Sequence, residues 1–313
     1  MTEKTIFEEK ASCIVNPRAA RNKWERRKRL RSYLMRNIPS EIIDIKGGKE
    51  KTIETARKKS LDHNIIIAIG GDGTIADVIQ GIIESGRAKD ILFGIIPFGS
   101  GNAFRKSLGI PKSSKKALKS LYHSQAKEID LIDIEGKKAG FASVGAIAQI
   151  TQEKLKHKIP GLLGHLLATR IIISLPRKNK EIELRQGFTD EGEPFERKIL
   201  KTRFFDCVVG KTSYFGYSWK VAPRAKLDDG FLDITLFETT GFKYILHFPL
   251  IYFGLYQRRF KHFKAKKVVI RGQDLFVQYN GEFLGVRDRV EIKVLPQALK
   301  VIYPQEKRIG LRS

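Results

Sequence analysis

Residues 64–74 read NIIIAIGGDGT, an apolar run that leads directly into a glycine-rich turn. A run that is apolar at consecutive positions predicts a strand buried on both faces, as the strands of parallel sheets are. Residues 75–82 then place apolar side chains every three or four positions, which predicts a helix. A buried strand, a glycine turn and a helix in this order indicate one unit of a parallel α/β sheet.

The same alternation of strands and helices extends on both sides of this stretch. Downstream, residues 91–96 are a second apolar run, which ends in the turn PFGSGN at residues 97–102. Upstream, the expected elements are a strand at 12–15, a helix at 20–36, a strand at 41–45 and a helix at 49–62. We therefore predict a Rossmann-like α/β domain over residues 12–128.

The pattern changes after about residue 129, where short β-like stretches follow one another at close spacing, as in a β-sandwich. They fall at residues 128–134, 181–184, 198–209, 231–237, 267–271, 275–279, 290–295 and 299–303. Helical stretches at 160–174 and 242–258 interrupt the series, and residues 177–196 read as a hairpin or a mobile loop. A second domain, a β-sandwich, is predicted over residues 129–304.

The composition limits the partners and the compartment. Lys and Arg outnumber Asp and Glu by 59 to 34, a net charge of +25 that favours nucleotides, acidic lipids or other polyanions. The two cysteines, Cys13 and Cys207, lie far apart and in no paired motif, so we expect a reducing, cytoplasmic location. No apolar run reaches about 18 residues, so contact with a membrane is expected to be peripheral.

Both glycine turns follow a buried strand directly, a position from which they could bind phosphate. Glycine lets the backbone approach an anion closely, and the helix after such a turn presents unpaired N–H groups and the positive end of its dipole. In parallel α/β sheets, ligands bind at the carboxyl ends of the strands. Either turn alone could be an ordinary tight turn, but the two together predict one phosphate site.

The two best-known nucleotide signatures are absent from the sequence. Residues 210–212 (GKT) resemble the end of a P-loop, but Phe205 stands where that motif needs its first glycine. Gly99 and Gly101 lack the third glycine of a dinucleotide-binding fingerprint. A phosphate site in this chain is therefore expected to be of another kind.

Five short motifs lie next to the expected strands. They are Asn16-Pro17-Arg18, Gly70-Gly71-Asp72-Gly73-Thr74, Pro97-Phe98-Gly99-Ser100-Gly101-Asn102, the stretch APRAKLDDGFLD at residues 222–233, and Asn280-Gly281-Glu282. In this order they resemble the diacylglycerol kinase catalytic-domain family, which includes bacterial diacylglycerol kinase-like enzymes, sphingosine kinases and ceramide kinases. The resemblance extends over almost the whole chain. It implies a nucleotide-binding α/β domain, a β-sandwich domain, and an ATP-dependent kinase that acts on a lipid hydroxyl.

The resemblance also assigns roles to residues, with ATP and Mg²⁺ as cofactors. ATP is expected to contact Asn16, Pro17, Arg18, Gly70, Gly71, Asp72, Gly73, Thr74, Gly99, Ser100, Gly101 and Asn102. A Mg²⁺ ion is expected at the carboxylate of Asp229 and near the backbone carbonyls of Lys226 and Phe231, although an ordinary turn would explain Asp228, Asp229 and Asp233 equally well. The lipid substrate is expected near Asp130 and Gly145, and the catalytic acids are Asp72 and Glu282.

Phosphoryl transfer requires positioning, charge neutralisation and a base near the attacking hydroxyl. Asp72 and Glu282 are the two candidates for the base, although Asp72 could instead cap its turn, and Glu282 could be a charge on a hairpin. Asn280 stands where the family usually has aspartate, and an amide cannot take the proton. Asp72 is therefore the predicted base, with Glu282 assisting, and a catalytically weak lipid-binding relative is the alternative.

Two neutral residues bear on the choice of lipid. Gln149 and Thr151 follow the stretch GAIA at residues 145–148, where sphingosine kinase-like members show acids. A sphingoid ammonium group would find no partner there, so we predict a lipid with a neutral headgroup, such as diacylglycerol. A sphingoid or ceramide-type lipid is the alternative substrate.

Residues 239–273 combine basic and aromatic side chains with no acid, which suits peripheral docking on an anionic membrane. Packing of these aromatic residues against the β domain is the alternative. A nicotinamide-dinucleotide kinase would share the GGDG turn but usually carries an Asn-Glu pair, which this chain lacks. A nucleic-acid-binding protein would suit the charge, but no zinc spacing, RNA-binding signature or helix-turn-helix pattern supports it.

Overall fold

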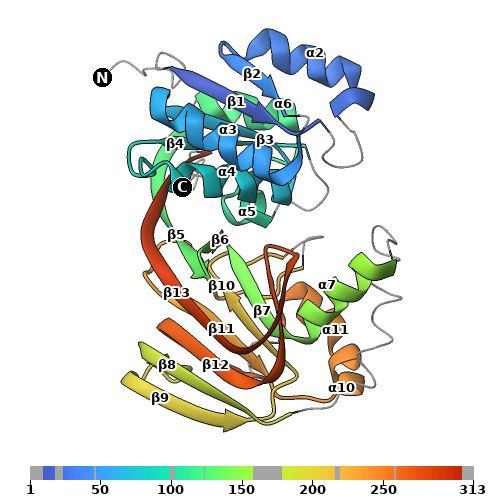
Figure 1. Ribbon diagram of the computed structural model, residues 1–313, viewed down its shortest axis with the longest axis vertical. Helices are drawn as coiled ribbons and strands as arrows, with labels where there is room; N and C mark the ends of the chain where they lie inside the picture. The colour runs from blue at the N-terminus through green and yellow to red at the C-terminus, as the bar shows by residue number, and fades with distance from the viewer. Residues whose placement is uncertain are drawn as a thin grey trace, which may run out of the picture. The chain divides into compact units, whose positions relative to one another are not determined.

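The computed structural model of the protein describes residues 10–17, 24–45, 47–98, 103–122, 124–157, 178–215, 219–256 and 259–304. The chain forms two compact units, one built from the chain up to Ile129 together with the segment from Gln297 on, and the other from Asp130–Pro296. The first unit is an α/β domain and the second is rich in β-strands (Figure 1). The division lies next to the predicted boundary at residue 129, but the end of the last strand belongs to the first unit.

A parallel sheet forms the centre of the first unit. Its order is β2 (Glu41–Asp44), β1 (Ala11–Val15), β3 (Ile65–Gly70), β4 (Leu92–Pro97) and the end of β13 (Glu282–Pro304). The end of β13 joins β4 through Lys300 and Val301, and Leu299 and Ile302 beside them are buried. This pairing explains why residues 297–304, which the sequence pattern assigns to the second domain, lie in the first unit.

Helices cover both faces of this sheet, as the consecutive apolar positions predict. They are α2 (Lys28–Asn37), α3 (Gly48–Asp62), α4 (Asp72–Glu84), α5 (Ala103–Ser107) and α6 (Ser114–Tyr122). Ile67 of β3 packs in one core with Leu34 of α2 and Leu118 of α6. The side chain of Ile66 points to the opposite face, because successive residues of a strand alternate, and α3 and α4 lie on that side (Figure 1).

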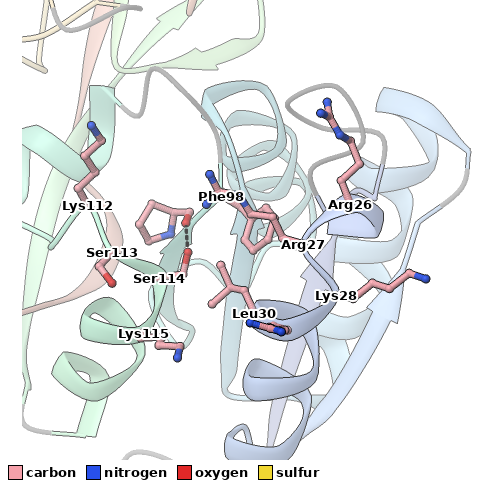
Figure 2. A pocket seen from close by; sticks show the side chains of 11 residues that line it. Arg26, Arg27, Lys28, Leu30, Phe98, Lys112, Ser113, Ser114 and Lys115 are labelled. Atoms are coloured by element: carbon pink, nitrogen blue, oxygen red, sulfur yellow. Dashed lines mark hydrogen bonds between the residues drawn. The ribbon is translucent and has the colours of Figure 1, made fainter.

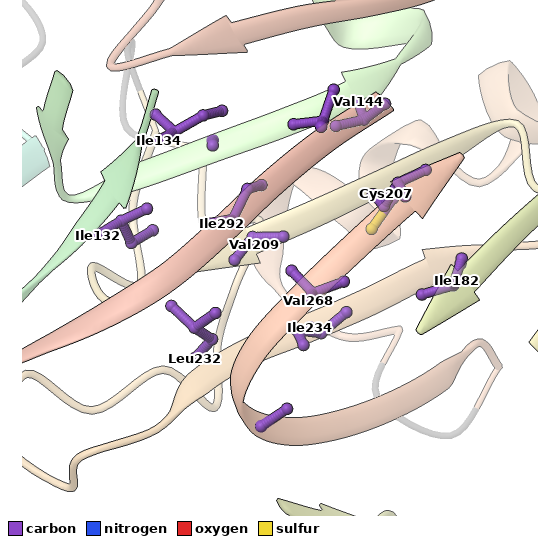
Figure 3. Packing of buried hydrophobic residues seen from close by; sticks show 14 of the residues in the cluster. Ile132, Ile134, Val144, Ile182, Cys207, Val209, Leu232, Ile234, Val268 and Ile292 are labelled. Carbon is purple, nitrogen blue, oxygen red and sulfur yellow. The ribbon is translucent and has the colours of Figure 1, made fainter. Parts of the chain in front are cut away.

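The second unit is built from antiparallel strands that enclose an apolar core, which confirms the predicted β-sandwich. The strands are β5 (Ser124–Ile134), β6 (Lys137–Ala139), β7 (Phe141–Gly145), β8 (Lys180–Thr189), β9 (Pro194–Thr202), β10 (Asp206–Gly210), β11 (Leu232–Phe237), β12 (Lys261–Tyr279) and β13. Ile132, Val144, Cys207, Ile234 and Val268 come from different strands and share this core (Figure 3).

Some β segments differ in extent from the sequence pattern. Residues 267–271 and 275–279 lie on one strand, β12, whose pairing with β13 shifts between Arg271 and Leu275. Residues 198–209 fall on two strands, β9 and β10. Residues 180–196 lie in the antiparallel β8–β9 pair, so the hairpin is the correct one of the two alternatives.

The helical stretch expected at 242–258 is divided into α10 (Gly241–Leu246) and α11 (Phe248–Phe253). Pro249 lies in the first turn of α11 and has no N–H with which to continue α10. A further helix, α7 (Ala146–His157), follows β7, whereas the helix expected at 160–174 lies outside the described residues. Among the described helices, none is long and apolar enough to cross a lipid bilayer.

Candidate functional site

Three strand ends of the first unit meet at one edge of the sheet. Val15 at the end of β1 pairs with Ile69, and Gly70 at the end of β3 pairs with Pro97 of β4. The backbone N–H of Phe98 donates a hydrogen bond to the carbonyl of Gly70 at 2.8 Å. The segments that follow these strands therefore start side by side, as the sequence predicts. Asn16, Pro17 and the GGDGT turn are placed there, whereas Arg18, Gly99, Ser100, Gly101 and Asn102 lie outside the described residues.

The GGDGT turn brings the start of α4 onto the end of β3. A Cβ atom at Gly70 would lie 2.5 Å from the Cβ atom of Thr74, so only glycine allows this approach. Gly71 occupies the N-cap position and has no side chain that could cap the helix. A Cβ placed at Gly73 would meet no described atom within 4 Å apart from its chain neighbours and the backbone of α4. The positive end of α4 thus has the closely approachable backbone that phosphate binding requires.

Asp72 links the two turns of the candidate site. It is the first residue of α4, and its Oδ1 accepts a hydrogen bond from the backbone N–H of Ala103 at 2.5 Å. Ala103 is the first residue of α5, which follows the second glycine turn. The carboxylate therefore holds the starts of two helices together, and its negative charge lies where helix dipoles stabilise it. Asp72 thus has a capping role, as considered for it, toward the start of α5.

A basic pocket adjoins Phe98 on the first unit. The pocket has a volume of about 810 Å³, within the range of small-molecule sites. Figure 2 shows cationic side chains around Phe98 and Ser114, and the hydroxyl of Ser114 donates to the carbonyl of Pro97 at 2.6 Å. The lining residues are Arg26, Arg27, Lys28, Arg29, Leu30, Pro97, Phe98, Lys112, Ser113, Ser114 and Lys115. Such a concentration of cations next to the strand ends favours an anionic ligand.

The predicted metal ligands of the second unit surround a lysine instead. Lys211 follows β10 and is fully buried, and its Nζ lies 2.7 Å from Asp229 Oδ1, 2.7 Å from Phe231 O and 2.8 Å from Asp130 Oδ2. Asp229 also forms an ion pair with Lys264 of β12. The ammonium group of Lys211 thus occupies the point at which oxygen atoms of Asp130, Asp229 and Phe231 meet. This donor set does not fit the divalent ion that the resemblance implies.

Two of the predicted site residues thus have a different setting from the one expected. Asp130 is 1 % exposed, and its Oδ2 also accepts the backbone N–H of Gly230 at 2.7 Å, which favours a structural role over contact with substrate. Lys226 is exposed. The sequence pattern misses Lys211 because its partners lie far away along the chain, and residues 210–212 are considered there only as a P-loop remnant.

The turn that carries Glu282 gives Asn280 a structural role. Asn280 and Gly281 have φ values of 46° and 83°, which suits the Asn-Gly hairpin turn predicted there. The side-chain oxygen of Asn280 accepts the backbone N–H of Gly140 at 2.9 Å, and its backbone N–H donates to Phe141 O at 3.0 Å. The side-chain oxygen of asparagine can accept the hydrogen bond from Gly140 as well as an aspartate oxygen could. Glu282 is half-buried and accepts the hydroxyl of Tyr279 at 3.1 Å.

Gly145 lies beside a buried carboxyl group that the sequence pattern does not reveal. A Cβ at Gly145 would lie 2.5 Å from the carbonyl oxygen of Phe205, and its φ of +131° suits glycine. On the paired strand β10, Asp206 is fully buried, and its Oδ2 accepts the backbone N–H of Ile147 at 3.0 Å, in the first turn of α7. Burial raises the pKa of Asp206 to about 8, against the hydrogen bond from Ile147 and the charge of Lys180.

A cavity of about 300 Å³ opens next to Gly145 in the second unit. Its walls are largely apolar, with polar and charged side chains at some positions. They are formed by Gly145, Ala146, Gln149, Lys178, Lys180, Phe204, Phe205, Gln273, Asp274, Leu275, Phe276 and Val286. The residue expected near the lipid thus lies in the wall of a cavity that could take an apolar group.

Comparison with known families matches both units of the chain. Residues 10–134 match the diacylglycerol kinase catalytic domain. Residues 195–303 match the YegS C-terminal NAD kinase beta sandwich-like domain. The order of the two matches is that of the α/β unit and the β-sandwich described above.

Whole-chain relatives agree with these matches. A diacylglycerol kinase of Staphylococcus aureus (strain MRSA252) is 25% identical over 274 residues, which are 83% of this chain and 79% of the relative. A diacylglycerol kinase of Staphylococcus saprophyticus is 24% identical over 257 residues, 78% of this chain and 81% of the relative. The crystal structure of a diacylglycerol kinase from Bacillus anthracis covers 94% of this chain and 97% of its own, with a TM-score of 0.72 and 23% identity, which shows the common fold.

Proposed function

Because the chain belongs to the diacylglycerol kinase family, with a catalytic domain of that family followed by its β-sandwich domain, we propose that it is an ATP-dependent lipid kinase. It transfers the γ-phosphate of ATP to a lipid hydroxyl, with diacylglycerol as the substrate and phosphatidic acid as the product. The observation that carries this proposal is the meeting of the strand ends at the start of α4, where Asp72 begins a helix whose N-cap is glycine. The neighbouring strand end, at Pro97 and Phe98, lines a basic pocket.

The first unit offers groups that fit a nucleotide. The backbone at Gly71, Gly73 and Thr74 would hold phosphate oxygens, and the segment at Asn16 and Pro17 starts from the neighbouring strand end. The cations of the basic pocket would add to the attraction of a polyanion. Mg²⁺ bound with the nucleotide would neutralise charge on the phosphates, and Asp72 is the carboxylate at this edge that suits such an ion.

The catalytic assignment follows from the chemistry of the available acids. We assign Asp72 as the base that takes the proton of the lipid hydroxyl as its oxygen attacks the γ-phosphorus and the bond to the leaving ADP breaks, with Glu282 as the other candidate acid. Asn280 accepts a hydrogen bond from the backbone of Gly140, so a structural role accounts for an amide at this position. The hydrogen bonds of Asn280 therefore weaken the alternative of a catalytically weak relative.

The residues beside the start of α7 favour a lipid without a positive headgroup. Gln149 lines the 300 Å³ cavity, and the hydroxyl of Thr151 is buried and donates to Ile147 O at 2.9 Å. The nearby carboxyl of Asp206 has a pKa of about 8 because of its burial, so it is largely uncharged at neutral pH. The carboxylate among the residues that line the cavity, Asp274, is already paired with Lys178, and Lys180 adds a positive charge there. These charges favour diacylglycerol over a sphingoid ammonium.

The proposal is tested by incubating the purified protein with γ-labelled ATP, Mg²⁺ and mixed micelles that contain diacylglycerol, ceramide or sphingosine. We expect label in phosphatidic acid. Label in a different lipid would keep the reaction class and replace the substrate. Retained ATP binding with no label in any lipid would contradict the kinase proposal and favour the catalytically weak relative.

A surface formed by α10, α11 and the loop after them suits contact with a membrane. Its large apolar side chains are exposed: Phe242 68 %, Leu246 68 %, Phe253 63 % and Leu255 69 %. Exposed basic residues accompany them, namely Lys243, Arg259 and Lys261. By contrast, Tyr256 and Phe263 are buried, so part of the aromatic run belongs to the core of the β domain. We propose that this α10–α11 surface binds the anionic membrane that holds the lipid substrate.

Replacing Phe242, Leu246 and Phe253 together by serine is expected to weaken binding to vesicles of phosphatidylserine and phosphatidylcholine by at least about tenfold. Each replacement removes an apolar side chain whose transfer from water into the membrane would favour binding. Co-sedimentation measures this change. The matched control replaces Met35 and Leu61, which are equally apolar and 52 % exposed in the first unit, and should bind as the wild type does. Equal binding by the triple variant and the wild type would remove the α10–α11 surface as the membrane contact.

A further inference from the structure

The protein satisfies every hydrogen-bond donor of the Lys211 ammonium group. Each of its three N–H groups has an acceptor at 2.7 or 2.8 Å, two of them carboxylates and the third a backbone carbonyl. Lysine is almost never fully buried unless it is paired, and here the side chain is 0 % exposed. The position is therefore built around a positive charge.

The charges of this cluster are already balanced. Asp130 and Asp229 contribute two carboxylates, and Lys211 and Lys264 contribute two ammonium groups. Each carboxylate oxygen of Asp229 accepts a hydrogen bond from one ammonium group, Oδ1 from Lys211 and Oδ2 from Lys264. A divalent cation added to this group would leave it with excess positive charge, and it would have to displace a fully buried ammonium group.

The same contacts fix the acidic loop between Leu227 and Phe231. The backbone N–H of Asp130 donates to Leu227 O at 2.6 Å, and the N–H of Phe231 donates to Asp229 Oδ1 at 3.2 Å. Lys211 draws both carboxylates and the carbonyl of Phe231 to one point. Holding oxygen ligands from separate segments together is what a bound metal ion does in a loop of this kind.

We propose that Lys211 is a built-in cation that takes the place of the divalent metal ion which the family resemblance assigns to Asp229, Lys226 and Phe231. The β-sandwich unit then holds its acidic loop without a metal, and the protein needs Mg²⁺ only with the nucleotide. The replacement of a metal ion by Lys211 concerns the folded chain alone. It can fail or hold whether or not the protein phosphorylates a lipid.

The test is thermal unfolding of the full-length protein without nucleotide or lipid, in excess EDTA and in millimolar MgCl₂ or MnCl₂. Wild type should unfold at the same temperature in all three solutions. Lys211→Ala removes the buried ammonium group from between Asp130 and Asp229, and the variant should unfold roughly 10 °C lower in EDTA. Because the deletion also opens a set of oxygen ligands, Mg²⁺ or Mn²⁺ should restore part of that loss.

Lys264→Met is the matched control, because Lys264 binds the other oxygen of Asp229 but is partly exposed. Its unfolding temperature should fall much less and should not respond to metal. An EDTA-induced loss of stability in the wild type would show a bound metal and overturn the proposal. A Lys211→Ala variant that is no less stable than the control, or that metal ions do not rescue, would equally overturn it.

Discussion

The Asp72→Asn variant is expected to form phosphatidic acid about 10²–10⁴ times more slowly than the wild type, while its stability changes little. Asparagine keeps the side-chain oxygen that accepts the N–H of Ala103, so the starts of α4 and α5 should stay together. It removes the negative charge and the basic oxygen, which the proposed proton transfer requires. The rate of labelled phosphatidic acid formation and the unfolding temperature, measured on the same preparation, separate these two effects.

Two further variants define what the Asp72→Asn result means. Asp90→Asn removes an exposed carboxylate of the same unit, whose partner is Arg87, and it should retain wild-type activity. Asp72→Ala also deletes the acceptor for Ala103, so it should be both inactive and less stable, by about 1–3 kcal/mol. If Asp72→Asn kept activity within about threefold of wild type, the base would have to be another group, and Glu282 would be the next residue to replace.

The first unit could be predicted closely because its signals are local. The apolar run at 65–69 is typical of a strand buried on both faces in a covered parallel sheet. The glycine turn after it leads directly into the amphipathic pattern of a helix. The Asn-Gly turn at residue 280 was equally predictable from the sequence, since left-handed φ values favour those two residue types. In each case the physical cause lies within about ten residues of sequence.

The polar interior of the second unit could not be predicted in the same way. Lys211 finds its acceptors on Asp130, Asp229 and Phe231, and only the folded strands bring these segments together. Asp206 starts a buried apolar strand, and nothing near it in sequence shows that it caps α7. Periodicity identifies which faces are buried, but it does not identify the partner of a buried charge.

Stability is expected to fall as the pH rises from about 4 to about 8, and Asp206 is the group responsible. Burial raises the pKa of this carboxyl from 3.8 to about 8 in the folded protein, whereas the unfolded chain releases the proton near the ordinary value. Unfolding therefore releases a proton between these limits, and a higher pH favours it. The slope cannot exceed about 1.4 kcal/mol per pH unit for one proton. Glu183 affects stability only at lower pH. Its hydrogen bond with Arg185 helps to lower the pKa of its carboxyl to about 2.

Asp206→Asn should remove most of this slope, because asparagine does not ionise and its side-chain oxygen can still accept the N–H of Ile147. Denaturant unfolding between pH 5 and pH 9 provides the measurement, and at pH 8 the variant should be the more stable protein. Asp274→Asn is the control, since that carboxylate is exposed in an ion pair with Lys178 and its loss should leave the slope unchanged. A slope that persists in Asp206→Asn would place the titrating group elsewhere. It would also mean that Asp206 is charged beside α7, which would weaken the preference for a neutral lipid.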